Sequence, residues 1–280
     1  MVIWKTAHIL FVMKAVISMD IIKSKDNSKI KYVRFLNRKK GRDLANAFTV
    51  EGIKFVNEAI KENSYIELLV FCKSAFDKKE IIELYSYSMN TGIEVIICED
   101  RVFDSISNTI HAQGVLAAVK KKDHINYIET GRFVVMCDRI QDPGNLGTII
   151  RTADAFGPAA VILNGGCVDA YNSKTVRATA GAIFRVPVVY DDSDVGIINK
   201  LKSFGYKIIS TVVDSKYSFD DVEKCEKICV VIGNEGSGVS QEIQNNSDMS
   251  ITIKMTGNAE SLNASIAAGI CIYEIRKKLL

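Results

Sequence analysis

The first half of the chain alternates short apolar runs with amphipathic segments. An amphipathic segment over residues 52–61 predicts a helix, and the apolar run IELLVFC after it predicts a buried strand. The alternation continues through a helix near residues 77–89, the strand IEVIICED, a short helix near residues 102–106 and the strand GVLAAVK. This pattern predicts a small α/β domain over residues 19–120 with a largely buried sheet.

The second half repeats the alternation with stronger signals. The predicted strands are RFVVMC, AAVIL, FRVPVVY, YKIISTVV, KICVVIG and SITIKM. Helices are predicted from Asn145, near residues 174–180 and 195–204, and from about Leu262 to the end. Continuous Val/Ile runs separated by helices predict a parallel sheet covered on both faces, over residues 131–280, where ligands gather at the carboxyl ends of the strands. The polar residues 121–130 between the two halves predict a linker.

Composition narrows the class of protein. The 280 residues, 48% of them hydrophobic and 25% charged, are typical of a soluble globular protein with ordinary cores. Seven cysteines without framework spacing favour a reducing, cytoplasmic setting. Residues 1–18 are mostly apolar, but Lys5, His8 and Lys14 divide them into apolar runs that are each too short to span a bilayer. We interpret them as a dispensable extension with Met19 as a plausible initiator, and we favour this over a signal peptide.

Charge is unevenly distributed along the chain. The net charge is only +3, yet residues 22–42 carry nine Lys or Arg residues against one acid, Asp26. Such an excess is the electrostatic footprint that phosphate backbones attract. Lys39, Lys40 and Arg42 are the candidate RNA contacts. A solvated helix face explains the run equally well, and the pattern alone does not decide between the two.

The first candidate motif is DPGNLGTIIRTADAFG, which follows a predicted strand. A helix that begins after Pro143-Gly144 directs free backbone N–H groups and a positive dipole end at whatever lies over the strand tip. Asn145 is either the cap of this helix or a functional residue. Arg151 lies near the helix centre among apolar residues, where it is either solvated or directed at an anionic partner.

The second and third motifs follow two later strands. In VVIGNEGSGVS, Gly233 and its neighbouring glycines permit a close approach of ligand to main chain, and Glu235 projects at the strand end; the alternative is a tight turn with Ser240 capping the next helix. In IKMTGNAESLNASIAAGI, Asn263 enters a helix of small residues that packs closely against a neighbour or a ligand. Neither motif matches a dinucleotide or P-loop fingerprint, and the scattered His and Cys residues predict no metal site and no nucleophilic triad.

In this order, these segments resemble the SpoU/TrmH family of RNA ribose 2′-O-methyltransferases. NLGTIIRTADAFG resembles the first family motif, IGNEGSGVS the second and ITIKMTGNAESLNASIAAGI the third. The segment between them, with Lys174 and Arg177 as further candidate RNA contacts, looks like the family's connecting segment, and residues 20–120 look like the substrate-binding domain of its ribosomal-RNA members. One departure is Lys254, where the family usually has proline; we expect little effect on activity.

The resemblance implies a parallel sheet with a deep C-terminal trefoil knot, S-adenosylmethionine as cofactor and a homodimer that completes the active site. The matching cofactor positions are Thr211, Gly233, Ile253, Met255 and Leu262, and the matching catalytic positions are Arg151, Asn145, Glu235 and Asn263.

Catalysis would place a ribose 2′-hydroxyl in line with the sulfonium methyl group. The corresponding arginine has been proposed as a general base in the family. Since arginine stays protonated in proteins, we interpret Arg151 as a phosphate clamp, with that phosphate or Glu235 accepting the proton. The added N-terminal domain favours ribosomal RNA over the alternative, transfer RNA. A non-catalytic RNA-binding protein is the rival class, and the four polar residues argue against it.

Overall fold

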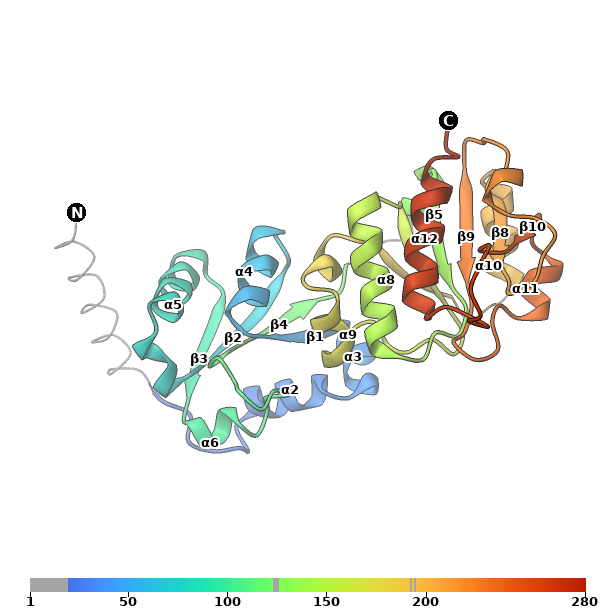
Figure 1. Ribbon diagram of the computed structural model, residues 1–280. Coiled ribbons are helices and arrows are strands. Elements are labelled where there is room, and N and C mark those ends of the chain that lie inside the picture. Colours follow the sequence, from blue (N-terminus) through green and yellow to red (C-terminus); the bar gives the residue numbers. More distant parts are fainter. Residues whose placement is uncertain (1–19, 123–125, 192, 194) are drawn as a thin grey trace. The chain divides into compact units, whose positions relative to one another are not determined.

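The computed structural model describes residues 20–122, 126–191, 193 and 195–280. The chain forms two compact units (Figure 1). The first comprises the residues up to Lys121 together with Tyr171–Ser173, and the second comprises the rest of the chain from Lys122 onward. The predicted extension at residues 1–18 lies outside the described residues.

The first unit is built on a four-stranded mixed sheet with the order β1-β4-β2-β3. Strands β1 (Ala47–Glu51) and β2 (Ile66–Cys72) run antiparallel to β4 (Val115–Lys120), whereas β3 (Glu94–Cys98) runs parallel to β2. The sheet is buried as the continuous apolar runs predict, because helices pack on it. The helices are α2 (Ser28–Leu36), α3 (Lys39–Ala45), α4 (Ile53–Lys61), α5 (Lys79–Thr91) and α6 (Asp100–Phe103).

The second unit contains a six-stranded sheet with the order β10-β8-β9-β5-β6-β7, and all of its recorded pairings are parallel. This confirms the predicted α/β class. The strands are β5 (Phe133–Cys137), β6 (Ala160–Asn164), β7 (Val188–Asp191), β8 (Lys207–Thr211), β9 (Ile228–Ile232) and β10 (Met249–Ile251). The helices are α7 (Asn126–Thr130), α8 (Pro143–Phe156), α9 (Ser173–Ala178), α10 (Val195–Ser203), α11 (Gln241–Asn245) and α12 (Ala264–Arg276).

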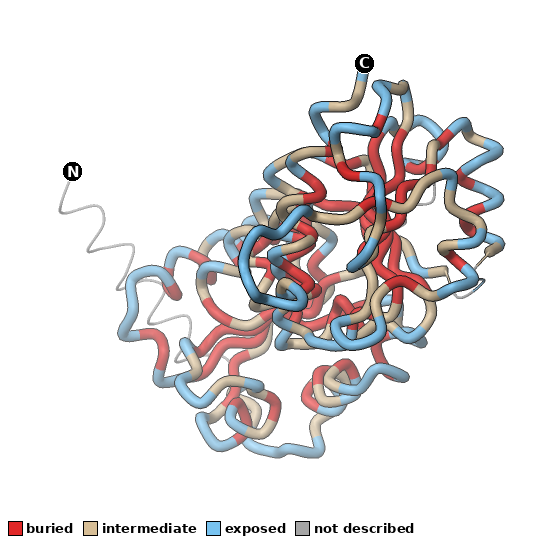
Figure 2. The backbone as a smooth tube through the Cα atoms, turned by 45° about the vertical axis from the view of Figure 1, so that its right-hand side comes forward, coloured by how far each residue is buried: buried red, intermediate tan, exposed pale blue. Residues whose placement is uncertain are grey.

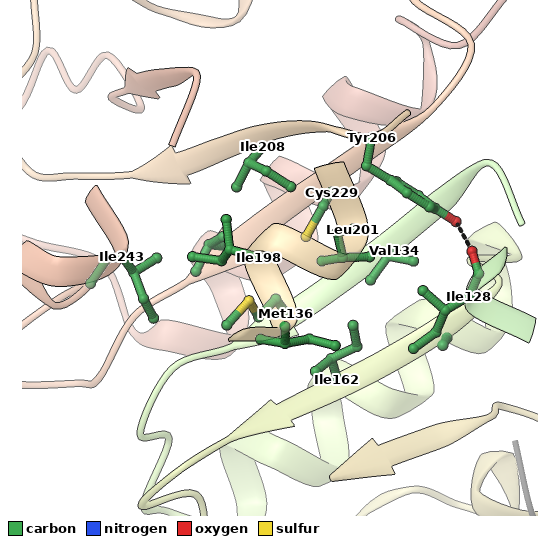
Figure 3. Close-up of a cluster of buried hydrophobic side chains, with 14 residues drawn as sticks. Ile128, Val134, Met136, Ile162, Ile198, Leu201, Tyr206, Ile208, Cys229 and Ile243 are labelled. Atoms are coloured by element: carbon green, nitrogen blue, oxygen red, sulfur yellow. Dashed lines mark hydrogen bonds between the residues drawn. The ribbon is translucent and has the colours of Figure 1, made fainter. Parts of the chain in front are cut away.

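The inner strands of the two sheets are almost wholly buried (Figure 2), namely β2, β4, β5, β6 and β9. In the second unit, Val134, Met136, Ile208 and Cys229 from three neighbouring strands form a cluster with residues of α10 and α11 (Figure 3). Ile128 of α7 belongs to the same cluster, and its carbonyl accepts a hydrogen bond of 2.9 Å from the Tyr206 hydroxyl. Residues 126–130 of the predicted linker are therefore a helix of the second unit.

Two element boundaries differ from the predicted ones in ways that matter for the site. Helix α8 begins at Pro143, and its cap is Asp142, whose carboxylate accepts from the Asn145 backbone N–H at 2.8 Å. Asn145 therefore lies inside the helix and is not its cap, so its side chain is available for other contacts. Strand β10 ends at Ile251, so the extended segment after it belongs to a loop rather than to the sheet.

Candidate active site

A cavity of about 340 Å³ lies at the carboxyl ends of β8 and β9. Its wall comes from the residues that follow β8, the loop that follows β9, and the segment from β10 into the first turns of α12. The lining residues are Thr211, Val212, Val213, Ile232, Gly233, Asn234, Glu235, Gly236, Gly238, Thr252, Ile253, Met255, Glu260, Ser261, Leu262, Ala264 and Ala267. The structure thus brings together all five residues that the resemblance assigns to the cofactor.

The lining has an unusual chemical character. Apart from two carboxylates, Glu235 and Glu260, it consists of apolar, small or neutral polar residues, and no Lys, Arg or His is among the described residues that form it. Much of the wall is main chain, because several lining positions are glycine. Such a cavity suits a ligand that carries positive charge and exposes an apolar surface.

Gly233 shows why the second motif needs glycine. A Cβ atom at this position would lie 2.1 Å from the Val239 backbone nitrogen and 2.2 Å from the Gly238 carbonyl carbon. These are main-chain atoms, so no side-chain rotation relieves the clash. The loop after β9 therefore folds back on the strand end so closely that only glycine fits.

Hydrogen bonds of Asn234 stabilise the closed conformation of this loop. Its backbone forms a pair of hydrogen bonds with Gly238, at 3.1 and 3.0 Å. Its side-chain oxygen accepts from the backbone N–H groups of Gly236 and Ser237, each at 3.0 Å. Its side-chain amide donates to the Arg139 carbonyl at 2.7 Å, which ties the loop to the end of β5. One amide side chain therefore sets the shape of this part of the cavity wall.

Asp138 also stabilises the loop that follows β9. Its carboxylate is 1% exposed and accepts from the Ser240 backbone N–H at 2.7 Å and from the Arg139 guanidinium at 3.2 Å. Arg139, which adopts a positive φ of 57°, also donates to the Gly238 carbonyl at 3.3 Å. A buried carboxylate is costly unless it is paired, and the contacts that pair this one fix the C-terminal end of the loop to the residues that follow β5.

The polar residues of the three motifs form one hydrogen-bonded chain. The Asn145 side-chain amide donates to the Glu235 carboxylate at 3.0 Å, and its oxygen accepts from the Asn263 amide at 2.9 Å. The Asn263 oxygen also caps α12, accepting from the backbone N–H groups of Ser265 at 2.9 Å and Ile266 at 3.3 Å. Segments more than a hundred residues apart therefore meet at the cavity in a fixed geometry.

Glu235 is held in its ionised form. Partial burial raises the pKa of its carboxyl, but hydrogen bonds from the Asn145 amide and from backbone N–H groups outweigh this and lower the pKa below the usual glutamate range. Two of those backbone donors are Gln141 and Asp142, both at 3.2 Å. An efficient general base has a pKa near the working pH. This environment therefore favours Glu235 as a structural anion over Glu235 as a proton acceptor.

Arg151 lies elsewhere. It is an exposed residue of α8, and it is not among the residues that line the cavity. Its guanidinium forms no hydrogen bond or ion pair with any residue in the described part of the chain, whereas the Asp154 carboxylate of the same helix pairs with Arg185 at 2.8 Å. The structure brings Asn145, Glu235 and Asn263 together and leaves the Arg151 guanidinium available for an external anion.

The candidate RNA contacts divide by exposure. Lys39 and Lys40 are exposed at the start of α3, and Lys174 is exposed on α9, while Arg177 is half-buried. Arg42 is only 6% exposed, and its guanidinium donates to the Leu36 carbonyl at 2.9 Å, near the end of α2. The structure thus gives Arg42 a structural contact instead of the surface position that the charge run suggests.

Sequence reasoning missed three residues of this site: Asp138, Asn234 and Glu260. Asp138 and Asn234 each stand within two residues of the end of a buried strand, which is a usable signal. The structure describes no group of three or more His, Cys, Asp or Glu residues that could hold a metal ion. No helix in its described part is long and apolar enough to cross a membrane.

Comparison with known proteins assigns the class. Residues 132–273 match the SpoU rRNA Methylase family, and residues 27–117 match the MRM3-like substrate binding domain. The chain belongs to the SpoU rRNA methylase family, as its three motifs indicate.

Relatives are similar over nearly the whole chain. The 23S rRNA (guanosine(2553)-2′-O)-methyltransferase RlmP of Bacillus subtilis is 34% identical over 92% of this chain and 100% of its own length. An AdoMet-bound rRNA methyltransferase from Sinorhizobium meliloti is 29% identical, with a TM-score of 0.79 over 93% of this chain and 98% of that one. The SpoU methyltransferase AviRb from Streptomyces viridochromogenes, in complex with AdoMet, is 25% identical, with a TM-score of 0.79 over 90% and 98%.

Proposed function

We propose that this protein transfers a methyl group from S-adenosylmethionine to a ribose 2′-hydroxyl of ribosomal RNA, with 23S rRNA as the first candidate. The observation that carries this proposal is the cavity at the strand ends, with its main-chain wall, two carboxylates and no basic side chain. S-adenosylmethionine has a sulfonium cation and an apolar adenine face, and it supplies an electrophilic methyl group. The named activity of the Bacillus subtilis relative supports the RNA substrate and the 2′-hydroxyl.

The roles of the polar residues follow from their contacts. Asn145, Glu235 and Asn263 form a rigid rim beside the cavity, and the amide groups of this rim would orient the nucleotide. Arg151 would clamp a phosphate next to the reacting ribose, since a guanidinium binds phosphate through two parallel hydrogen bonds. We favour that phosphate as the proton acceptor, because the lowered pKa of Glu235 makes its carboxylate a weak base.

We also propose a homodimer in which Arg151 of one subunit reaches the cavity of the other. Within one chain Arg151 lies away from the cavity lining, on a helix beside α12 (Figure 1). On α12, Ile266 and Tyr273 are 56% and 50% exposed, so they present apolar surface that a partner could bury. A second copy packed on α8 and α12 would cover them. A trefoil knot near the C-terminus and a cytoplasmic location complete the proposal, and the reduced cysteines fit that location.

The function is tested by methyl transfer. The protein is incubated with radiolabelled S-adenosylmethionine and unmodified total RNA, which is then separated into ribosomal and transfer fractions and digested to nucleosides. We expect label in a 2′-O-methylnucleoside of the large ribosomal RNA. Label in the transfer RNA fraction would identify transfer RNA, instead of ribosomal RNA, as the substrate. Absence of any S-adenosylmethionine binding would support the non-catalytic RNA-binding class instead, whereas cofactor binding without transfer would indicate a missing substrate or assembly state.

Arg151 and the dimer are tested together by mixing two inactive variants. Arg151→Ala should abolish methylation and leave cofactor binding intact, whereas Gly233→Ala should lose the cofactor. If Arg151 acts across the dimer, random reassociation restores about a quarter of the wild-type rate, because about half of the dimers are mixed and each has one complete site. A mixture that stays inactive although mixed dimers form would place Arg151 in its own subunit's site.

A further inference from the structure

Ile110 is the most exposed large hydrophobic side chain in the described part of the chain. It is 96% exposed, whereas the next most exposed, Leu44 and Tyr65, are 70% exposed. It lies at the tip of the loop that connects α6 to β4 in the first unit, directly before the exposed His111. A chain gains nothing for its own fold from an isoleucine in this position, since its side chain buries almost no surface.

The loop that carries Ile110 is firmly held. The Glu51 carboxylate accepts from the hydroxyl groups of Ser107 and Thr109, both at 2.6 Å, and from the Asn108 backbone N–H at 2.8 Å. On the other side of the tip, the Gln113 side-chain oxygen accepts from the Ile53 backbone N–H at 2.8 Å, at the start of α4. One end of the loop is thus attached to the last residue of β1, and the other end to the first residue of α4. The fold displays Ile110 on a fixed platform.

The same loop contacts the segment between helices α2 and α3, both of which carry several Lys and Arg residues. The Asn37 side-chain amide donates to the Ile106 carbonyl at 3.2 Å, and its oxygen accepts from the Asn108 amide at 2.9 Å. Asn37 is the C-cap of α2, and the next three residues, Arg38, Lys39 and Lys40, are all exposed. Apolar and cationic groups therefore share one surface of the first unit, and two hydrogen bonds fix their separation.

We infer that residues Ile110 and His111 contact the face of an unstacked RNA base, while Arg38, Lys39 and Lys40 hold the neighbouring phosphates. This inference rests on the proposed RNA substrate and names the part of the first unit that reads it. Single-stranded loops of RNA expose base faces to aromatic and apolar side chains, and the adjoining backbone supplies negative charge. The charge of the surface favours RNA over a protein partner, because interface cores between proteins are depleted in lysine.

The test separates the apolar contact from the charges. Binding of an unmodified 23S rRNA transcript and of a blunt RNA duplex is measured over a range of salt concentrations for Ile110→Ser, for Lys39→Ala combined with Lys40→Ala, and for Met89→Ser. Met89 is the matched control, since it is 57% exposed on α5 of the same unit. Ile110→Leu is the conservative variant that should restore binding.

We expect Ile110→Ser to weaken transcript binding by roughly ten- to a hundredfold, the loss of one buried isoleucine side chain, without changing the salt dependence or the duplex affinity. The lysine variant should lower the slope of log K against log salt by about 1.4, for two phosphate contacts with single-stranded RNA. Met89→Ser should bind as the wild type does. Unchanged transcript binding by Ile110→Ser, or an equal loss for duplex and transcript, would overturn the inference.

Methylation kinetics distinguish this inference from the proposed function. Ile110→Ser should raise KM for the transcript and leave kcat and the affinity for S-adenosylmethionine unchanged, because the loop belongs to the first unit and every cavity residue belongs to the second. If the wild-type protein methylates no RNA, the proposed function fails. If the wild type is active and Ile110→Ser has an unchanged KM, only the role of this loop is refuted. If Ile110→Ser bound RNA as the wild type does but lost binding to a protein, the ligand of this surface would be that protein, and the inference would be refuted.

Discussion

Gly233→Ala is the substitution whose effect the structure defines most sharply. The added methyl group would lie 2.1 Å from the Val239 nitrogen, 2.2 Å from the Gly238 carbon and 2.7 Å from the Gly238 oxygen. Ordinary van der Waals contact begins at 3.4 Å, so the main chain of the loop must move by about 1.3 Å. Asp138 and Asn234 tie this loop to the end of β5, so the movement also strains those hydrogen bonds.

The size of the effect follows from that displacement. Overpacking of a tight site costs about 1–3 kcal/mol, which for a protein of this size lowers Tm by roughly 2–10 °C. The functional loss should be larger, because the displaced loop is itself a wall of the cavity. A misplacement of about 1 Å reduces catalysis roughly a hundredfold. We therefore expect at least a tenfold weaker affinity for S-adenosylmethionine, about 1.4 kcal/mol, together with a nearly complete loss of methyl transfer.

Calorimetric titration with S-adenosylmethionine and a thermal melt of the same samples measure both quantities. Gly257→Ala is the matched control, because a Cβ at Gly257 meets no atom within 4 Å. It should bind the cofactor and melt as the wild type does. A Gly233→Ala protein that binds the cofactor within a factor of two of the wild type would show that the loop does not form the binding wall, and the assignment of the cavity would have to be abandoned.

Three further substitutions probe the polar groups around the cavity. Asn263→Ser keeps a capping oxygen for α12 but loses the amide that contacts Asn145, so methylation should fall roughly tenfold with little change in Tm, while Asn263→Ala should also lose about 1 kcal/mol of stability. Because the pKa of Glu235 is lowered in the folded protein, its ionised carboxylate stabilises the fold at pH values above the usual glutamate pKa. This stabilisation is lost as the pH falls through the lowered pKa, so Glu235→Gln should reduce the difference in stability between about pH 7 and about pH 3. Glu260→Gln should weaken the binding of S-adenosylmethionine more than the binding of the product S-adenosylhomocysteine, which lacks the sulfonium charge. The ratio of the two Kd values should change by roughly three- to tenfold, and an unchanged ratio would exclude an electrostatic role for this carboxylate.

The periodicity of the chain was sufficient to predict most of the fold. The apolar runs that became β2, β5 and β9 were located to within a residue or so, because strands buried on both faces are continuous in sequence. Periodicity failed where a tertiary contact decides. Residues 126–130 are polar enough to suggest a linker, yet Ile128 packs in the core of the second unit, and the backbone carbonyls of Ile128 and Glu129 accept hydrogen bonds from Tyr206 and Lys227.

The site was predictable in its main-chain part and less so in its side-chain part. Small residues and glycines after strands signal a close approach of the backbone, and Gly233 and Ile253 both reached the cavity. Contacts between distant segments leave no such local signal. Nothing in the sequence pairs Asn145 with Asn263, and the burial of Arg42 depends on how α3 returns toward the end of α2. A charge run reports composition, whereas exposure depends on packing.

The placement of charge in this protein suits its two proposed ligands differently. Among the described residues, the lining of the cavity carries Glu235 and Glu260 and no basic side chain, which favours a sulfonium cation and binds the thioether product, which lacks that charge, more weakly after transfer. The cations proposed to meet RNA, among them Lys39, Lys40 and Arg151, are exposed and outside the cavity lining. A basic residue inside the lining would repel the cofactor, and a bare acidic surface would repel the RNA backbone. One chain can serve both ligands because the fold separates these charges, and in the proposed mechanism the guanidinium of Arg151 is the group that is brought to the cavity for the reaction.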